Sequence, residues 1–199
     1  MPRITQPTLA EHRAARERAL LDAAHDLLVE TGEAPSLAEV AERVGLARTS
    51  VYQYFKSQRD LLYAMVQDVY PQWVERVATS MAAAPSLADQ VMSYAVANVE
   101  LVAEGAHVVG SALAALGPNE AVDEQAARMH RDLQEPLIAV LVQLGVTGPE
   151  EVAGLINAVI HTAAALLLEE GRSTGEVLNF IAEVLGPMVR ELGGQGHVS

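Results

Sequence analysis

Residues 48–56, RTSVYQYFK, bring together side chains that could contact a nucleic acid. A guanidinium and a carboxamide can hydrogen-bond base edges in the major groove of DNA, while hydroxyl, phenol and ammonium groups can hold phosphates. Val51 and Phe55 are apolar and stand four positions apart, so they can anchor one face of a short helix in a core. The polar side chains would then lie on its other faces, within reach of DNA.

The preceding residues predict the element that holds this stretch in place. Ser36 and Glu39 have the spacing of a capping box, which starts a helix. An apolar stripe at helical spacing follows, made of Leu37, Val40, Ala41 and Val44. Gly45 can adopt the left-handed conformation that ends a helix. Residues 36–56 therefore indicate two short helices joined by a tight turn, the second over residues 47–55.

The run VGLARTSVYQYFKSQRDLL, residues 44–62, resembles the helix-turn-helix signature of tetracycline-repressor-type (TetR) transcriptional regulators. The resemblance implies that the short helix enters the major groove, that Lys56 touches a phosphate and that a dimer reads a palindrome. Ala47 departs from the family pattern because a hydroxyl residue often caps the helix there. Thr49 stands where a small residue, often glycine, is usual, which leaves the contacts of Thr49 open.

We expect eight residues of the helix pair, residues 36–56, to form the DNA-binding site. Arg48, Gln53 or Ser50 is best able to read bases, whereas phenol and ammonium groups should mainly grip phosphates. The predicted DNA-binding residues are Ser36, Arg48, Thr49, Ser50, Tyr52, Gln53, Tyr54 and Lys56. The same stretch could instead be a generic pair of amphipathic helices in an all-helical core, but so many polar and aromatic residues between two core anchors favour DNA binding.

The charge of the chain is unevenly distributed around its net value of −13. Residues 1–80 hold nine Lys and Arg against eleven Asp and Glu, a net charge of −2, whereas residues 81–199 hold four against fifteen, a net charge of −11. Phosphate contacts need local positive potential, so only the first part can offer a DNA-binding surface. Its cations are expected to form a stripe along that surface: Arg3, Arg13, Arg16, Arg18, Arg43, Arg48, Lys56 and Arg59.

The composition also indicates the cellular compartment in which the protein is expected to work. The chain has no cysteine, so it offers no disulfide or thiolate metal site and fits a reducing cytoplasm. No charged segment followed by an apolar run marks a signal peptide, and no apolar run approaches the roughly 20 residues that span a bilayer. We expect a soluble cytoplasmic protein with no membrane partner.

Start signals for helices recur along the chain, and no strand-like alternation interrupts them. Besides Ser36 with Glu39, the paired signals are Thr8 with Glu11, Ser57 with Asp60, Ser86 with Asp89, Thr147 with Glu150, and Ser173 with Glu176. The later helices are predicted over residues 87–104, 106–116, 120–145, 149–170 and 175–192. The sequence therefore predicts an all-α fold of about nine helices.

Together with the resemblance, this pattern predicts two domains. A three-helix helix-turn-helix DNA-binding domain would occupy residues 1–58, and a helical effector-binding and dimerisation domain would occupy residues 59–199, joined by the fourth helix. Pro71 lies inside that helix and cannot donate to the carbonyl of Gln67, so a kink or break is expected near it. Such a kink could be static, or it could convert a shift in one domain into rotation of the recognition helix.

The last two predicted helices are apolar over too wide an arc for one neighbouring helix. Each must therefore lie in the middle of a domain or face a second subunit. The resemblance implies dimerisation through these helices as a four-helix bundle, so we expect an isologous homodimer. The predicted dimerisation residues are Leu155, Val159, Leu167, Leu178, Ile181 and Leu185.

The resemblance implies an effector pocket. It would lie among the middle helices and be mostly apolar, with a few polar groups that give specificity. The candidates are Trp73, Met92, Tyr94, Asn98, His107, Met129 and His161, and each could equally be an ordinary core or boundary residue. Only 4% of the chain is aromatic. The pocket would therefore suit a small or aliphatic neutral effector better than a large planar cation.

Catalytic motifs are weak by comparison. Glu104 and His107 have the Glu-x-x-His spacing of di-iron carboxylate bundles, but such sites need two copies and further glutamates. No His-Glu-x-x-His, phosphate-binding glycine loop or GxSxG motif occurs. We expect no enzyme, no catalytic residue, no metal and no cofactor.

The sequence thus predicts a dimeric regulator that binds an inverted-repeat operator in double-stranded DNA. A repressor released from DNA by an unidentified, apolar small molecule is the favoured form. A regulator that uses a corepressor, or a DNA-binding or architectural protein without any small-molecule effector, remains the alternative.

Overall fold

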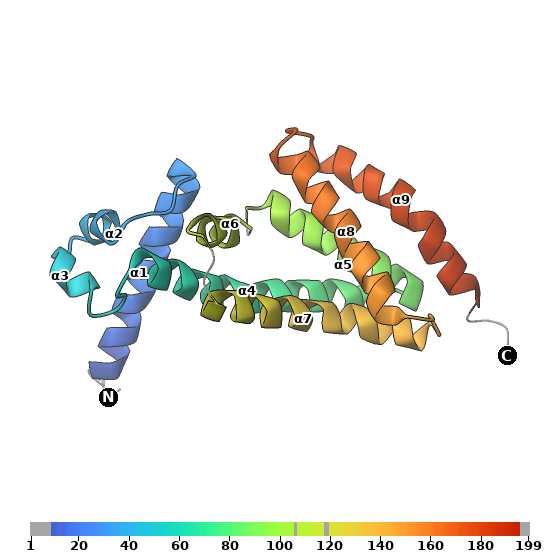
Figure 1. The fold of residues 1–199 in the computed structure, drawn as a ribbon, viewed down its shortest axis with the longest axis horizontal. Coiled ribbons are helices and arrows are strands. Elements are labelled where there is room, and N and C mark those ends of the chain that lie inside the picture. Colours follow the sequence, from blue (N-terminus) through green and yellow to red (C-terminus); the bar gives the residue numbers. More distant parts are fainter. Residues whose placement is uncertain (1–8, 106, 118–119, 196–199) are drawn as a thin grey trace, which may run out of the picture. The chain divides into compact units, whose positions relative to one another are not determined.

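The computed structural model describes residues 9–105, 107–117 and 120–195, and within them the chain forms nine α-helices and no strand (Figure 1). The all-α fold class is confirmed. The helices are α1 (Leu9–Thr31), α2 (Leu37–Arg43), α3 (Arg48–Val51), α4 (Gln58–Ala83), α5 (Leu87–Ala103), α6 (Val108–Ala115), α7 (Glu120–Gln143), α8 (Pro149–Leu168) and α9 (Thr174–Gln195).

The contacts divide the chain into two compact units. The N-terminal unit comprises Met1–Val69 and His107–Pro118, so it includes α6 as well as α1 to α3 and the first part of α4. The C-terminal unit comprises Tyr70–Ala106 and Asn119–Ser199. The predicted domain boundary after residue 58 stays a prediction.

In the N-terminal unit, α1 contacts α2 and α6, and α2 contacts α3. On α1 the apolar side chains Leu20, Ala23, Ala24 and Leu28 are buried, and Leu27 is half-buried. The largest side chains closed off from solvent in this unit are Leu20, Leu28, Val40, Val51, Leu61, Leu62 and Met65. These side chains form the support on which the recognition segment is mounted.

The capping box that begins α2 is confirmed. The Ser36 backbone N–H donates to Glu39 Oε2 at 2.7 Å, and the Glu39 backbone N–H donates to Ser36 Oγ at 3.2 Å. The two hydrogen bonds with Ser36 lower the pKa of Glu39. The helix ends at Gly45, whose φ of +68° lies in the left-handed region that glycine adopts without strain. Residues 36–45 thus fold as their local chemistry predicts.

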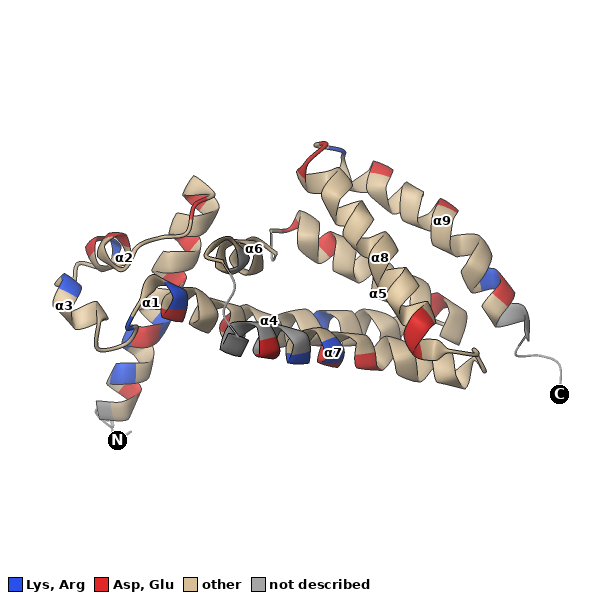
Figure 2. Cartoon of the chain, viewed as in Figure 1, with Lys and Arg blue, Asp and Glu red and all other residues tan. Residues whose placement is uncertain are grey.

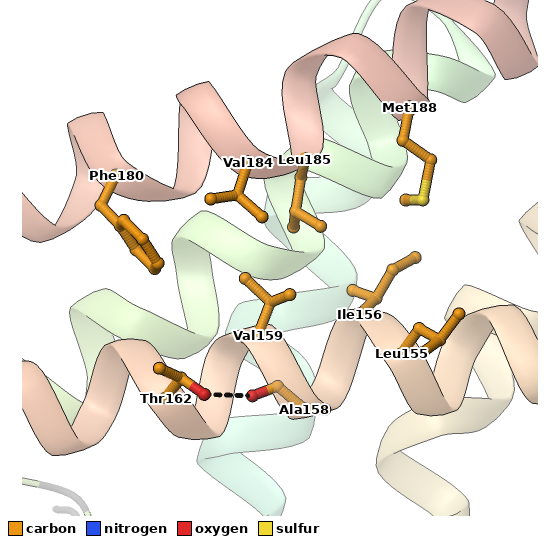
Figure 3. A pocket seen from close by; sticks show the side chains of 9 residues that line it. All are labelled: Leu155, Ile156, Ala158, Val159, Thr162, Phe180, Val184, Leu185 and Met188. Atoms are coloured by element: carbon orange, nitrogen blue, oxygen red, sulfur yellow. Dashed lines mark hydrogen bonds between the residues drawn. The ribbon is translucent and has the colours of Figure 1, made fainter.

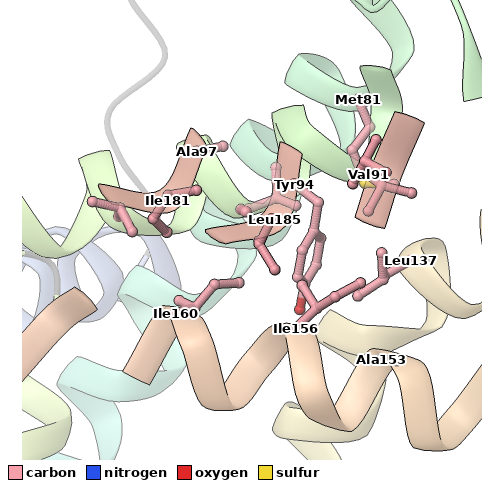
Figure 4. Packing of buried hydrophobic residues seen from close by; sticks show 14 of the residues in the cluster. Met81, Val91, Tyr94, Ala97, Leu137, Ala153, Ile156, Ile160, Ile181 and Leu185 are labelled. Atoms are coloured by element: carbon pink, nitrogen blue, oxygen red, sulfur yellow. The ribbon is translucent and has the colours of Figure 1, made fainter. Parts of the chain in front are cut away.

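The C-terminal unit is built around α5, which contacts α7, α8 and α9. Eight of its 17 residues are buried, between Val91 and Val102, so this helix packs against several neighbours at once. Figure 4 shows Tyr94 and Ala97 packed among Ile156, Ile160, Ile181 and Leu185. The core of this unit is therefore formed by side chains from at least four helices.

Proline does not end the helices that contain it. α4 continues from Gln58 to Ala83 with Pro71 inside it, so the break predicted as one possibility is absent, and the kink stays a prediction. Pro136 and Pro187 also lie inside helices, in α7 and α9. At the start of α8 the predicted cap at Thr147 is wrong, because Gly148 is the N-cap and Pro149 occupies the first turn. The cap predicted at Thr8 lies outside the described residues.

One expectation from composition needs correction. α8 is 20 residues long with a mean hydropathy of 1.7 over its most apolar 18-residue window, so by length and composition it could cross a membrane. We expected no segment to approach that limit. A helix covered by protein on two sides has the same composition, and Ala153, Ile156, Ile160 and Ala163 of α8 are buried in the core.

Candidate nucleic-acid interface

The recognition segment, residues 47–56, is a shorter helix than predicted. α3 spans only Arg48–Val51, and the chain then tightens, since Tyr54 N–H donates to Val51 O at 2.9 Å. The two predicted anchors are confirmed: Val51 is fully buried and Phe55 is 2% exposed. Their burial leaves the intervening residues on the surface of the unit.

The eight predicted DNA-binding residues do not share one environment. Arg48, Thr49, Gln53 and Lys56 are exposed, Tyr52 is 43% exposed, and Ser50 and Tyr54 are half-buried. Ser36 is half-buried and its hydroxyl caps α2. Seven of the eight therefore lie in the recognition segment, and Ser36 has a structural role at the start of the preceding helix.

Two arginine–tyrosine pairs involve the recognition segment, one within it and one that joins it to α1. Arg48 Nη2 donates to the Tyr52 hydroxyl at 3.0 Å, and its guanidinium carbon lies 5.6 Å from the centre of the Tyr52 ring. Arg13, from α1, lies 5.3 Å from the centre of the Tyr54 ring and donates from Nη2 to the backbone oxygen of Gln53 at 3.3 Å. Sequence reasoning placed Arg13 in the cation stripe expected along the DNA-binding surface but missed this contact, because Arg13 and Gln53 are 40 residues apart.

Three of the eight cations expected to form a stripe along this surface are engaged by other groups of the chain; Figure 2 shows the charged residues in colour. Arg18 is paired with Asp22 and with Asp68, and these hydrogen bonds raise its pKa.

Two further cations of the expected stripe are engaged within the N-terminal unit. Arg43 pairs with Glu30 at 2.7 Å, which lowers the pKa of that carboxyl. Arg59 donates to the backbone oxygens of Leu116 at 2.5 Å and Gly117 at 3.0 Å, where it caps the end of α6. Arg3 lies outside the described residues. Besides these, four cations of the stripe are exposed, Arg13, Arg16, Arg48 and Lys56, and of these Arg13, Arg48 and Lys56 belong to the recognition segment or contact it.

Lys56 stands at the junction of the recognition segment and α4. Its backbone N–H donates to Asp60 Oδ2 at 2.8 Å, and the Asp60 N–H donates to Ser57 Oγ at 3.1 Å. The predicted cap formed by Ser57 and Asp60 is thus present, with Lys56 supplying the second donor. This cap fixes the backbone from which the exposed Lys56 ammonium extends.

In the C-terminal unit, α8 and α9 form an open groove of about 330 Å³ (Figure 3). Its lining is almost entirely apolar, and it includes exposed Leu155 (64%) and Val184 (43%). The groove is lined by Leu155, Ile156, Ala158, Val159, Thr162, Phe180, Val184, Leu185 and Met188.

The six predicted dimerisation residues lie at different depths. Leu155 and Val159 line the groove and are open to solvent at least in part. Leu185 lies at its floor and is 2% exposed, whereas Ile181 is fully buried in the core. Leu167 and Leu178 are half-buried against that core. The part of the set that a partner could touch is therefore centred on Leu155 and Val159.

The seven predicted effector-binding residues are not brought to one place. His107 belongs to the N-terminal unit, whereas the other six belong to the C-terminal unit. The Met129 carbonyl accepts a hydrogen bond from Tyr70, and the exposed His161 ring stacks on His130 with centres 6.0 Å apart. Met92 packs half-buried against the core. None of the seven lines the groove between α8 and α9.

Three of these candidates, Trp73, Asn98 and Tyr94, do meet in a buried polar chain. Trp73 Nε1 donates to Asn98 Oδ1 at 2.9 Å, and Asn98 Nδ2 donates to the Tyr94 backbone oxygen at 2.8 Å. The Tyr94 hydroxyl donates to Asn157 Oδ1 at 3.0 Å. Burial raises the pKa of Tyr94 to about 12, so its phenol stays protonated and can donate at neutral pH. The chain ties α4, α5 and α8 together.

The Glu-x-x-His motif does not form a metal site. Glu104 ends α5 and pairs with Arg76 at 2.7 Å, and Gly105 turns the chain with a φ of +89°. Glu104 and His107 belong to different compact units. The described part of the chain holds no group of three or more His, Asp or Glu side chains placed to bind a metal ion.

Comparison with known proteins adds a family. Residues 20–65 match the model of bacterial regulatory proteins of the tetR family. A transcriptional regulator of the TetR/AcrR family from Thermobifida fusca superposes with a TM-score of 0.70 at 22% identity, covering 86% of this chain and 96% of that one.

Two further solved structures share the fold at low identity. The fatty acid degradation regulator FadR from Bacillus halodurans has a TM-score of 0.69 at 13% identity, covering 91% of this chain and 96% of its own. FadR from Bacillus subtilis, in complex with stearoyl-CoA, has a TM-score of 0.66 at 16% identity, covering 82% and 96%. Comparison with curated protein sequences gave no significant match. Residues 20–65 thus match the N-terminal segment of the tetR family of bacterial regulatory proteins, and the chain as a whole shares its fold with solved TetR-family regulators.

Proposed function

We propose that two copies of this chain bind an inverted-repeat DNA operator, each placing its recognition segment in a major groove. The observation that carries this proposal is the exposed Arg48, Gln53 and Lys56, held on a short helix and turn whose Val51 and Phe55 are buried in the core. Such a segment can approach base edges with its backbone held fixed. Bound at a promoter, the dimer would block polymerase and repress transcription.

The proposed dimer uses the groove between α8 and α9. Leu155 and Val184 are large apolar side chains left on the surface, and contiguous exposed apolar patches mark interaction sites. Residues 81–199 carry a net charge of −11, so this half is unsuited to nucleic acid. A second copy of the same groove is an apolar partner of matching shape, which favours an isologous dimer.

The proposed effector is a small, mainly apolar molecule taken up by the C-terminal unit in the cytoplasm. Two lines support its class: the aliphatic composition of that unit, and a relative of the same fold that holds stearoyl-CoA. The effector would release the repressor by binding better to a conformation that fits the operator poorly, and its leverage is limited to that difference in affinity.

Selection from random DNA tests the proposed function. Purified protein is mixed with a random duplex library at low ionic strength, and the bound molecules are recovered and sequenced. We expect an inverted repeat with half-sites spaced by about one helical turn, or a multiple of it. Absence of any enriched inverted repeat would reject the proposed function.

A matched pair of substitutions tests the dimer. Leu155→Glu places a carboxylate in the proposed interface, whereas Val142→Glu places one on α7, at a side chain that is also exposed (58% against 64%). We expect Leu155→Glu, but not Val142→Glu, to convert the dimer to a monomer in analytical ultracentrifugation. The resulting monomer should still unfold cooperatively, as a folded protein does. If both variants have the same oligomeric state, the dimer interface does not lie at this groove.

A compound screen on the selected operator then separates the regulatory alternatives. Loss of DNA binding on addition of a metabolite fraction supports an inducer, and gain of binding indicates a corepressor. If no fraction changes operator affinity, the protein is a regulator or architectural protein without a small-molecule effector.

A further inference from the structure

We propose that Arg13 is a positioning residue for the recognition segment, and that it sets sequence discrimination without touching DNA phosphates itself. This inference rests on the proposed DNA-binding function. Its guanidinium joins two groups of the segment: it lies 5.3 Å from the centre of the Tyr54 ring, and it donates to the backbone oxygen of Gln53 at 3.3 Å. Both contacts fall within the range of attractive interactions.

The recognition segment needs such a support because its helix is so short. α3 ends at Val51, and residues 52–54 form a turn whose internal hydrogen bonds are Gln53 N–H to Ser50 O at 3.2 Å and Tyr54 N–H to Val51 O at 2.9 Å. Val51 and Phe55 fix the two ends of this turn in the core. The peptide between Gln53 and Tyr54 lies between those anchors, and its carbonyl oxygen is the atom that Arg13 holds.

The orientation of that peptide determines where the exposed Gln53 side chain points. A carboxamide reads an adenine edge only when it lies flat against both acceptor and donor of the base. Rotation of the Gln53–Tyr54 peptide would tilt the carboxamide out of that plane. Arg13 therefore acts on base reading through the backbone of Gln53 and through the Tyr54 ring beside it.

The chemistry of its partners distinguishes Arg13 from other cations of α1. Arg18 is neutralised by two carboxylates, Asp22 and Asp68. Arg13 instead contacts a neutral carbonyl oxygen and the face of an aromatic ring. A guanidinium makes both contacts at once because it is planar and carries several donors, and a lysine ammonium in its place would lose the flat stacking.

Three variants test the inference: Arg13→Ala, Arg13→Lys and Arg16→Ala. Arg16 lies three residues further along α1, is also exposed, and its substitution changes the net charge equally. We expect Arg13→Ala to reduce discrimination between the selected operator and one altered at the Gln53 base pair by roughly fivefold per half-site. Arg13→Lys should show most of this loss, and Arg16→Ala should keep wild-type discrimination.

The salt dependence of binding separates positioning from phosphate contact. If Arg13 held a phosphate, its removal would lower the slope of log affinity against log salt by about 0.9 per contact and weaken every sequence equally. We expect Arg13→Ala to leave that slope equal to the wild-type slope. A smaller slope with unchanged discrimination would overturn the proposal.

Amide hydrogen exchange in the free protein supplies a readout that needs no DNA. We expect faster exchange in residues 52–55 of Arg13→Ala than in Arg16→Ala, with equal exchange in the core of the C-terminal unit. Identical exchange in the two variants would overturn the positioning role. Should the wild type enrich no operator, the proposed function fails, while the exchange comparison still decides whether Arg13 holds the turn.

Discussion

The recognition segment and the groove between α8 and α9 are both exposed surfaces, but they are supported in opposite ways. The first is a four-residue helix and a turn, carried by two buried anchors and rich in polar groups. The second is spread over helices of 20 and 22 residues and is almost entirely apolar. The contrast indicates that the proposed base reading would depend on a few side chains held in fixed positions. The proposed association of two copies would instead depend on the apolar area that they bury.

The largest effect should come from an anchor of the small surface. Phe55→Ala removes a side chain that is 2% exposed, so the free energy of unfolding should fall by about 3–5 kcal/mol and operator binding should be lost. Urea unfolding and a DNA-binding titration measure both.

The matched control lies in the core of the C-terminal unit. Ile181→Ala, at a fully buried position, should cost about 2–5 kcal/mol and yet leave discrimination between operators intact in the folded protein. If Phe55→Ala binds the operator like the wild type, the short segment does not depend on its anchors.

A buried hydrogen bond should have a smaller effect. Asn98→Leu removes the acceptor of Trp73 Nε1 at similar side-chain volume, so the free energy of unfolding should fall by about 1–3 kcal/mol. The emission of Trp73, the single tryptophan, should shift as its environment changes. Unchanged stability would show that water can serve as the acceptor.

Base reading by Gln53 is a local test of the small surface. If its carboxamide reads an adenine edge, Gln53→Ala should lose about 1–3 kcal/mol of discrimination at one base pair per half-site. Binding to single-base operator variants measures this loss. An equal loss on every sequence would assign Gln53 to the phosphates instead.

Phosphate contact by Lys56 should affect binding to all DNA sequences, in contrast to the effect of Gln53 at one base pair. Lys56→Ala should weaken all sequences alike and reduce the salt slope by about 0.9 for each lost contact. Titrations at several salt concentrations measure the slope. A slope equal to that of the wild type would remove Lys56 from the contacting residues.

The smallest effect concerns pH and the C-terminal unit. Burial, and then the neighbouring His161, lower the pKa of His130. The folded state therefore binds this proton less readily than the unfolded chain, and stability should fall as the pH drops through the unfolded pKa of about 6.5. His130→Gln should reduce the loss of thermal stability between pH 7.5 and 5.5, while His12→Gln on α1 serves as the control. A loss of the wild-type size in His130→Gln would contradict this assignment.

Local chemistry was enough to predict much of the N-terminal unit. The Ser36 cap, the turn at Gly45 and the anchors Val51 and Phe55 each depend on residues a few positions apart, and all four are present. Helix-start signals likewise predicted the number of helices and, to within a few residues, most of their bounds.

Contacts between distant residues lay beyond such reasoning. Nothing near Arg18 in the sequence predicts its pairing with Asp68, 50 residues away, so the expected stripe included cations that acidic side chains of the chain already engage. The apolar spacing of Val51 and Phe55 also fits a helix of nine residues, although the chain tightens after four. The effector candidates shared only residue type and rough position, and His107 fell in the other compact unit.

The assignment of α6 to the N-terminal unit has a consequence for anyone dissecting this protein. The unit is not one continuous piece of chain, because His107–Pro118 belongs to it and Arg59 caps the carbonyls that follow α6. A fragment truncated after residue 69 would uncover the part of α1 that contacts α6 and leave the Arg59 guanidinium without both acceptors. Chimeras that join this N-terminal unit to the C-terminal domain of another protein should therefore carry both of its segments, Met1–Val69 and His107–Pro118.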